Sequence, residues 1–251
     1  MTGRTPMPLI RLDKLISDSG RASRSEAKAL IRAGRVSVDG RIASRGEDKY
    51  ERSAVVTIDG EAIDAARFHY VMLHKPAGVL SATEDARQET VLDLLPPALR
   101  RLELFPVGRL DKDTTGLLLL TDDGDFAHRV ISPKKHVPKR YRARLDAPLE
   151  EGDVEAFATG LTLEDGTDCL PAALRVTGPA EGLVTVYEGK YHQVKRMFAA
   201  RGKHVLALHR EQVGSLALDP SLPPGGFRSL SPEEAAKALE PGSCENDGRI
   251  F

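Results

Sequence analysis

Residues 108–121, which read GRLDKDTTGLLLLT, decide the fold of the longer part of this chain. A polar loop runs here directly into four leucines, which predicts a buried strand with a loop at its start. Such a loop can hold a carboxylate at the rim of a cleft while the apolar run anchors it, which suits a catalytic group that needs fixed geometry. Aspartate is equally common in turns, because its side chain accepts hydrogen bonds from nearby backbone amides. The spacing alone leaves the roles of Asp111 and Asp113 open.

The other charged residues of this loop allow two further interpretations. Arg109 would stabilise an ionised carboxylate if the two side chains meet in space, which adjacency in sequence does not establish. Asp111 and Asp113 could in principle be the acid and the base of a glycosidase, but two positions in one loop give this pairing weak support. Asp113 is also explained as a turn residue.

The sequence around the loop predicts an α+β fold. Residues 70–73 predict a buried strand, and a turn follows at residues 75–78, where Pro76 cannot donate to a central ladder. Helices are expected at 126–131 and 194–200, and extended segments at 141–145 and 183–187. The sequence contains no internal repeat, low-complexity segment or glycine-rich phosphate loop.

The first sixty residues predict a small separate module that begins with two helices. Leu12, Leu15 and Ile16 lie on one helical face, and Gly20 permits the left-handed end of that helix. Ser23 starts a second helix, since a glutamate three positions later completes a capping box, and a glycine at position 34 ends it.

Strands complete this predicted module. Residues 36–42 alternate around an Asp-Gly turn, which is typical of a hairpin, and residues 55–58 add another strand before a second Asp-Gly pair. The polar, alanine-rich residues 61–68 are interpreted as a linker. We therefore predict domains at 1–60 and 69–240, with an acidic, poorly ordered tail at 241–251.

Charge is distributed unevenly along the chain. The formal net charge is −1, but residues 1–60 carry 12 lysines or arginines against 8 acidic residues, a net of +4. Several of the five cations on or beside the second helix must project to solvent, because its apolar stripe faces inward. The five are Arg21, Arg24, Lys28, Arg32 and Arg35. These side chains could follow RNA phosphates, or they could form an ordinary solvated face.

Composition narrows the class of protein further. The 251 residues are 41% hydrophobic and 29% charged, as in an ordinary soluble protein. Cys169 and Cys244 have no metal-ligand spacing, residues 1–9 lack the apolar core of a signal peptide, and no apolar run is long enough to span a bilayer. These features predict a cytoplasmic protein without a structural metal.

Several motifs, in order, resemble those of two known families. Residues 11–14, 23–27 and 34–40 resemble the alpha-L RNA-binding domain, which a small-subunit ribosomal protein shares with several RNA-modifying enzymes. Residues 108–116 resemble the signature of the pseudouridine synthases, in the branch that acts on small-subunit ribosomal RNA. The motifs KPAG at 75–78, KRY at 139–141 and EGKYHQVKRM at 188–197 strengthen this resemblance.

The resemblance implies a catalytic domain with a central, mostly antiparallel mixed sheet and flanking helices. It implies that Asp111 is the catalytic carboxylate, that Tyr141 stacks on the target base and that Lys195 is the basic partner of Asp111. Without the motifs, Tyr141 would be a core residue and Lys195 a surface cation. Many relatives have arginine at position 195, and His74 replaces an expected asparagine without an assigned role.

The resemblance also implies contacts with RNA. The expected RNA-binding residues are Arg11, Lys14, Arg24, Lys28, Arg32, Arg35, Lys75, Arg109 and Arg196. His128, His192, His204 and His209 are interpreted as surface or core residues, because none has the spacing of a zinc site.

The expected function is isomerisation of a uridine to pseudouridine in ribosomal RNA by a monomeric enzyme. The reaction loses no atoms and needs no redox or phosphate cofactor, so no cofactor is expected. Two alternatives remain open. One is a target in large-subunit RNA, although residues 191–198 favour the small subunit. The other is a ribosome-assembly factor that binds RNA without catalysis.

Overall fold

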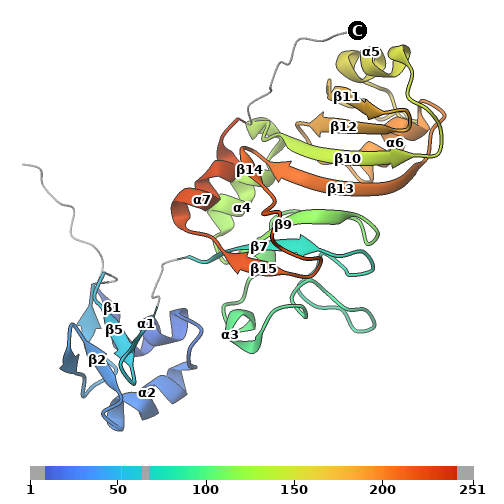
Figure 1. The fold of residues 1–251 in the computed structure, drawn as a ribbon. Helices are drawn as coiled ribbons and strands as arrows, with labels where there is room; N and C mark the ends of the chain where they lie inside the picture. The colour runs from blue at the N-terminus through green and yellow to red at the C-terminus, as the bar shows by residue number, and fades with distance from the viewer. Residues whose placement is uncertain (1–8, 52, 64–67, 242–251) are drawn as a thin grey trace, which may run out of the picture. The chain divides into compact units, whose positions relative to one another are not determined.

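The structure is a computed structural model that describes residues 9–51, 53–63 and 68–241. The chain divides into two compact units, one of Met1–His69 with Leu95–Leu104 and the other of Tyr70–Leu94 with Phe105–Phe251 (Figure 1). The expected tail at 241–251 and Cys244 lie almost entirely outside the described residues. No described helix is long and apolar enough to cross a membrane.

The described part of the first unit contains three α-helices and two small sheets. Helices α1 (Leu12–Asp18) and α2 (Arg24–Arg32) pack on a sheet of order β3-β2-β5-β6. Its strands are β2 (Val36–Val38), β3 (Arg41–Ile42), β5 (Val56–Ile58) and β6 (Glu61–Ala62). The sequence did not predict β6, nor the antiparallel pair β1 (Ile10–Arg11) and β4 (Lys49–Tyr50).

Local signals of this unit are confirmed. The Ser23 hydroxyl accepts from the backbone amide of Glu26, and the Glu26 carboxylate accepts from the Ser23 amide at 2.7 Å, which completes the capping box. Asp39 and Gly40 both have positive φ, 49° and 77°, as the two central residues of a type I′ hairpin turn require. Hydrogen bonds between neighbours in sequence therefore form the start of α2, and the φ angles at Asp39 and Gly40 fit the predicted hairpin turn.

One segment departs from the domain limits expected from sequence. Residues 95–104, which contain α3 (Pro97–Arg100), belong to the first unit. Arg101 lies 3.6 Å from the carboxylate of Glu26, and Gly20 is so close to Ala98 that a Cβ at position 20 would lie 2.5 Å from its carbonyl oxygen. The boundary expected at 61–68 stays a prediction.

The second unit is built on one nine-stranded mixed sheet, as predicted. Its order is β11-β12-β10-β13-β9-β7-β15, which Figure 1 shows from top to bottom, with β14 (Leu216–Ala217) on β13 and β8 (Phe105–Pro106) on β9. The main strands are β7 (Tyr70–Lys75), β9 (Thr115–Thr121), β10 (Lys139–Leu145), β11 (Ala173–Gly178), β12 (Glu181–Val186), β13 (Val205–Val213) and β15 (Phe227–Ser229). All pairings are antiparallel except β13 with β9.

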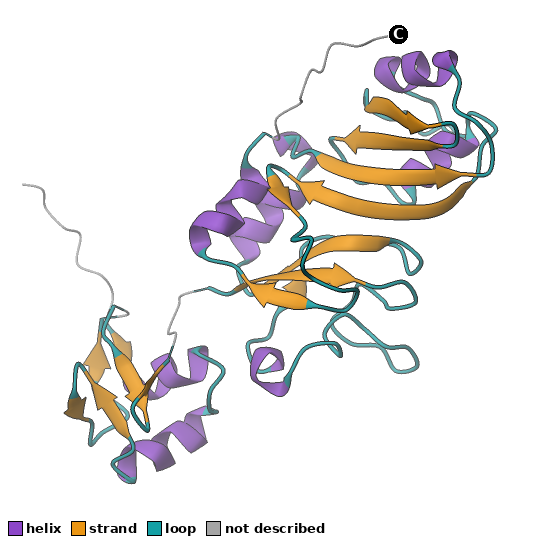
Figure 2. Cartoon of the chain, in the orientation of Figure 1, coloured by secondary structure: helices purple, strands orange, loops and turns teal. Residues whose placement is uncertain are grey.

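Helices cover the two halves of this sheet separately (Figure 2). Helix α4 (Gly124–Ile131), helix α7 (Pro232–Ala236) and the turn η2 (Lys237–Leu239) enclose one apolar core with β7 and β9. Helices α5 (Glu151–Thr159) and α6 (Gln193–Ala199) enclose a second core with β10, β12 and β13. A short turn, η1 (Pro133–Lys135), follows α4.

Gly116 lets the two halves of the sheet meet. It has φ +106° and pairs with Arg210 across the parallel junction of β9 and β13. A Cβ at this position would lie 2.3 Å from the backbone oxygen of Arg210 and 2.6 Å from its nitrogen. Only glycine accommodates both this φ and this approach.

Gly116→Ala should therefore lower the free energy of unfolding by about 3 kcal/mol or more, because backbone atoms cannot move aside as a flexible side chain can. Gly124→Ala is the matched control, since position 124 has open space around its Cβ and lies in the first turn of α4. The control should be neutral or stabilise by up to about 1 kcal/mol. Urea unfolding of both variants measures the difference, and equal midpoints would contradict the prediction.

Candidate active site

The loop that carries Asp111 connects β8 to β9 and is held by hydrogen bonds on both sides. The Ser81 hydroxyl donates to the carbonyl of Leu110 at 2.9 Å and accepts from the amide of Leu110 at 3.1 Å. The amide of Gly78 donates to the carbonyl oxygen of Lys112 at 2.8 Å. The amide of Thr114 donates to the carbonyl oxygen of Asp111 at 3.1 Å. The loop is thus fixed immediately before and after Asp111.

Lys75 supports the same loop from inside the protein. Its side chain is fully buried, and its ammonium donates to the carbonyls of Pro76, Lys112 and Thr114 at 2.9, 3.1 and 3.0 Å. Burial lowers the pKa of Lys75 to about 8, although the carboxylates of Asp113 and Asp111 oppose this shift. Three acceptors match the three N–H groups of an ammonium, so the loop binds the charged form.

The burial of Lys75 corrects one expectation from the sequence. Lys75 was predicted to bind RNA, but a fully buried side chain cannot reach it. The motif KPAG at 75–78 acts here as the end of β7 and the turn that contacts the Asp111 loop. Lys75 instead holds the backbone of the Asp111 loop in place through its hydrogen bonds to Lys112 and Thr114.

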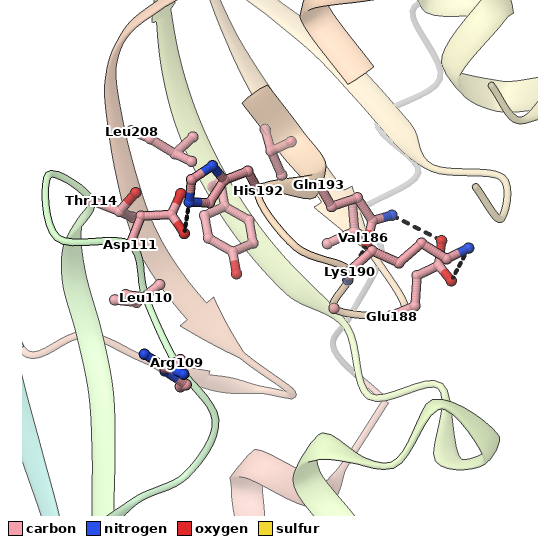
Figure 3. A pocket seen from close by; sticks show the side chains of 13 residues that line it. Arg109, Leu110, Asp111, Thr114, Val186, Glu188, Lys190, His192, Gln193 and Leu208 are labelled. Atoms are coloured by element: carbon pink, nitrogen blue, oxygen red, sulfur yellow. Dashed lines mark hydrogen bonds and ion pairs between the residues drawn. The ribbon is translucent and has the colours of Figure 1, made fainter. Parts of the chain in front are cut away.

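Asp111 lies between two basic side chains. Its Oδ2 is 3.2 Å from Nζ of Lys195, and its Oδ1 is 3.4 Å from Nε2 of His192. Figure 3 shows the carboxylate and the His192 ring facing one another. The side chain of Asp111 is 23% exposed, so a ligand can reach it. The pairing with Lys195 is the one that the resemblance implied.

Lys195 binds Asp111 and Asp113 together. Its Nζ donates to Oδ1 of Asp113 at 2.5 Å, a contact that lowers the pKa of that carboxyl. Burial lowers the pKa of Lys195, but hydrogen bonds to Asp113 and Asp111 outweigh burial and hold it above its ordinary value. Lys195 is therefore a cation at neutral pH. The Asp113 side chain is 75% exposed, so its ion pair contributes little to stability.

His192 is a site residue that the sequence analysis missed. It precedes α6 with a left-handed backbone, φ 48°, which is uncommon for a residue other than glycine. Its ring stacks on that of Tyr191 with centroids 3.8 Å apart, and Tyr191 is largely exposed. Histidine spacing gave no signal, and only the position of His192 inside the EGKYHQVKRM motif could have indicated it.

A cavity of about 450 Å³, part of which is open to solvent, lies beside Asp111. Asp111 and Tyr141, which were expected from the sequence, and His192, which was not, all line its wall. The structure therefore brings these three side chains together. Glu188 also lines it and accepts from the side chain of Gln193 and the amide of Leu170, both at 2.9 Å. This network fixes the segment before α6 (Figure 3).

The other expected RNA-binding residues of this unit differ in their surroundings. Arg109 belongs to the Asp111 loop, is exposed and lines the cavity. Arg196 is partly exposed, does not line the cavity and forms an ion pair of 2.5 Å with Asp165. Arg109 is therefore better placed than Arg196 to meet a ligand of the cavity.

The expected RNA-binding residues of the first unit are all exposed, but several are already paired. Arg11 binds both oxygens of the buried Asp13, and Lys28 lies 3.8 Å from the same carboxylate. Lys14 binds Asp18, and Arg35 binds Asp59. Arg24 and Arg32 form no salt bridge with the part of the chain that the structure describes.

The described residues contain no group of three or more histidine, cysteine, aspartate or glutamate side chains that could hold a metal ion.

The fold and this site define an RNA-modifying enzyme, and the chain belongs to the RNA pseudouridylate synthase family. Residues 69–200 match that family, and residues 10–56 match the S4 domain. The chain is an isomerase that carries an RNA-binding domain at its amino terminus.

Individual relatives support this assignment over nearly the whole chain. It is 47% identical to an uncharacterised RNA pseudouridine synthase of Bacillus subtilis, YtzG, over 92% of this chain and 99% of the relative. Identity is 43% to the ribosomal small subunit pseudouridine synthase A of Escherichia coli K12, over 92% and 100%. A crystal structure of a pseudouridylate synthase is similar with a TM-score of 0.65 and 38% identity, over 91% of this chain and 99% of that one.

Lys75→Met should lower the free energy of unfolding by about 3 kcal/mol, because three buried carbonyl oxygens lose their donor. Lys112→Met is the matched control on the same loop, since the Lys112 side chain is exposed and, among the described residues, bonds only the side chain of Gln88. The control should change stability by less than about 0.5 kcal/mol. Urea unfolding measures both, and a stable Lys75→Met variant would show that the loop does not depend on this lysine.

Proposed function

We propose that this enzyme isomerises one uridine of small-subunit ribosomal RNA to pseudouridine, with Asp111 as the essential carboxylate. One observation carries the proposal: the Asp111 carboxylate lies in a cavity, within 3.2 Å of Lys195, in a chain of this family. The small-subunit target is supported by the names of relatives at 42–44% identity that span nearly the whole chain.

The proposed reaction requires a carboxylate held against the ribose. The bond from C1′ to N1 of uracil breaks, the ring turns, and C1′ joins C5, which gives up its proton as N1 gains one. Asp111 serves as the nucleophile towards C1′ or as the base for the proton on C2′, and both roles need its ionised form. Lys195, whose raised pKa keeps it charged, would hold this carboxylate and offset its charge.

Tyr141 is proposed to stack on the target base. A uridine must leave its helical stack to reach Asp111, at a cost of a few kcal/mol. Stacking on an aromatic ring returns about 1 to 3 kcal/mol per base. Tyr141 and Asp111 line the same cavity, so one base could contact both.

The amino-terminal unit is proposed to hold the RNA through phosphate contacts. Arg24 and Arg32 suit this role best, since they are exposed and no described carboxylate forms a salt bridge with them. Arg11, Lys14, Lys28 and Arg35 would first have to exchange an ion pair for a phosphate. Phosphate contacts of this kind give affinity that falls with salt and carry no sequence information.

Asp111→Asn should lower the single-turnover rate by at least about 10³-fold, since an amide can neither attack carbon nor take a proton. Tritium release from small-subunit ribosomal RNA labelled at C5 of uridine measures the rate, and filter binding should show unchanged RNA affinity. Asp113→Asn is the control, because Asp113 shares Lys195 but is exposed. Its rate should fall by less than about tenfold, and substantial tritium release by Asp111→Asn would refute the role of Asp111.

Deletion of the gene should remove one pseudouridine from small-subunit ribosomal RNA. Carbodiimide mapping of both ribosomal RNAs detects the missing site, and the wild-type chain should restore it whereas Asp111→Asn should not. Loss of a site in large-subunit RNA would change the proposed target. An unchanged map would favour a ribosome-assembly factor that binds RNA without modifying it.

A further inference from the structure

A second cavity adjoins the one that contains Asp111. It measures about 560 Å³, part of it open to solvent, and it shares Arg109, Tyr141, Glu188 and Gly189 with the first cavity. Asp111, His192 and Lys195 do not line it. Tyr141 therefore has the expected base site on one side and this second cavity on another.

Two nearly buried cations line the second cavity. Lys139 and Arg210 are 7% and 5% exposed and come from the adjacent strands β10 and β13. Much of the remaining wall is apolar and includes Leu119, Val130 and Val213. A cation in such surroundings loses the solvation of water and requires an anion or hydrogen-bond acceptors in return.

Among the described residues, the Lys139 side chain has neither an anion nor a hydrogen-bond acceptor as a partner. Its side chain forms no hydrogen bond and no ion pair with residues 9–51, 53–63 or 68–241, in contrast to the equally buried Lys75, which has three acceptors. Burial and the neighbouring charge of Arg210 lower the pKa of Lys139 to about 8. At neutral pH most of the Lys139 side chains are still charged.

Arg210 is only partly satisfied. Its Nε donates to the carbonyl of Leu117 at 2.8 Å, and its Nη1 lies 3.4 Å from the Tyr141 hydroxyl. Nη2 bonds none of the described residues. The guanidinium carbon also lies 5.9 Å from the centre of the Tyr141 ring, so Arg210 contacts the same side chain that is proposed to stack on the base.

Glu188 is the one carboxylate that lines the cavity, and its oxygens are already used. Oε1 accepts from Gln193 and Leu170, and Oε2 pairs with Lys190 at 3.1 Å. Neither Lys139 nor Arg210 lies within ion-pair distance of it. The cavity thus holds two buried positive charges without a negative charge from the described chain to balance them.

We infer that the cavity of Lys139 and Arg210 binds a phosphate of the RNA backbone beside the target nucleotide. An ammonium and a free guanidinium edge are strong donors to phosphate oxygens, and the low-polarity wall strengthens such bonds. A phosphate held there would fix the register of the strand, with Tyr141 between the phosphate and the reacting base. The identity of the ligand as RNA rests on the proposed function.

The inference predicts that Lys139 confers a preference for uridine monophosphates over uridine. Calorimetric titration in phosphate-free buffer should show that uridine 5′- or 3′-monophosphate binds the wild-type chain at least about fivefold more tightly than uridine, since a hydrogen bond between two charged groups is stronger than one between neutral groups. Lys139→Met should abolish this preference. Lys237→Met, which removes an exposed lysine of η2, should retain it.

Thermal unfolding separates a binding role of Lys139 from a structural one. Lys139→Met should melt at a higher temperature than the wild type, because it removes a buried charge without a partner. Uridine monophosphate should raise the melting temperature of the wild type and of Lys237→Met more than that of Lys139→Met. A variant that melts lower, or that keeps the preference for the monophosphate, would overturn the inference. So would a wild-type chain that binds neither monophosphate more tightly than uridine.

The same titration does not depend on the proposed reaction. If the wild-type chain lacks isomerase activity on ribosomal RNA yet shows the Lys139-dependent preference, the proposed function fails and the phosphate site stands. If activity is present but Lys139→Met retains the preference, the site fails and the proposed function stands.

Discussion

The two halves of the catalytic sheet meet where the backbones of β9 and β13 run side by side at Gly116 and Arg210. This junction is the one parallel pairing described in the sheet, and it spans two residue pairs. Because it is parallel, the loop before β9 and the segment before β13 lie at the same end of the sheet. Asp111 belongs to the first and Lys195 to the second, so the ion pair between them depends on a backbone approach that a Cβ at position 116 would prevent.

Charge is arranged differently in the two adjoining cavities. Around Asp111, one lysine binds two carboxylates and a histidine faces one of them, so each carboxylate has a partner within the protein. Lys139 and Arg210 form no ion pair with the described residues. Asp111 can thus be held in place before RNA binds, while the neighbouring cavity retains an attraction for a polyanion. Tyr141 lines both cavities and links the two.

Features set by neighbours in sequence were predictable. The Ser23 capping box, the hairpin around Asp39 and the strand after the Asp111 loop depend on hydrogen bonds or side-chain alternation within a few residues, and the structure has all three. Lys75 was wrongly assigned to RNA, since a lysine ending a strand is usually exposed. Its three acceptors lie on two segments, and two of them are 37 and 39 residues away in sequence. His192 was missed because a left-handed backbone, which no motif rule predicted, directs its ring towards Asp111.

The sequence by itself determined the family, the α+β class and the position of the Asp111 loop directly before a buried strand, because these depend on short motifs that keep their spacing along the chain. Only the tertiary structure decided which cations face a ligand. Lys75, Lys139 and Lys195 are all lysines of the recognised motifs, but their surroundings differ. Lys75 donates to carbonyl oxygens, and Lys195 binds two carboxylates. The Lys139 side chain lines a cavity and has no partner among the described residues. The partners of a charge come from distant segments, and burial sets how strongly each charge needs one.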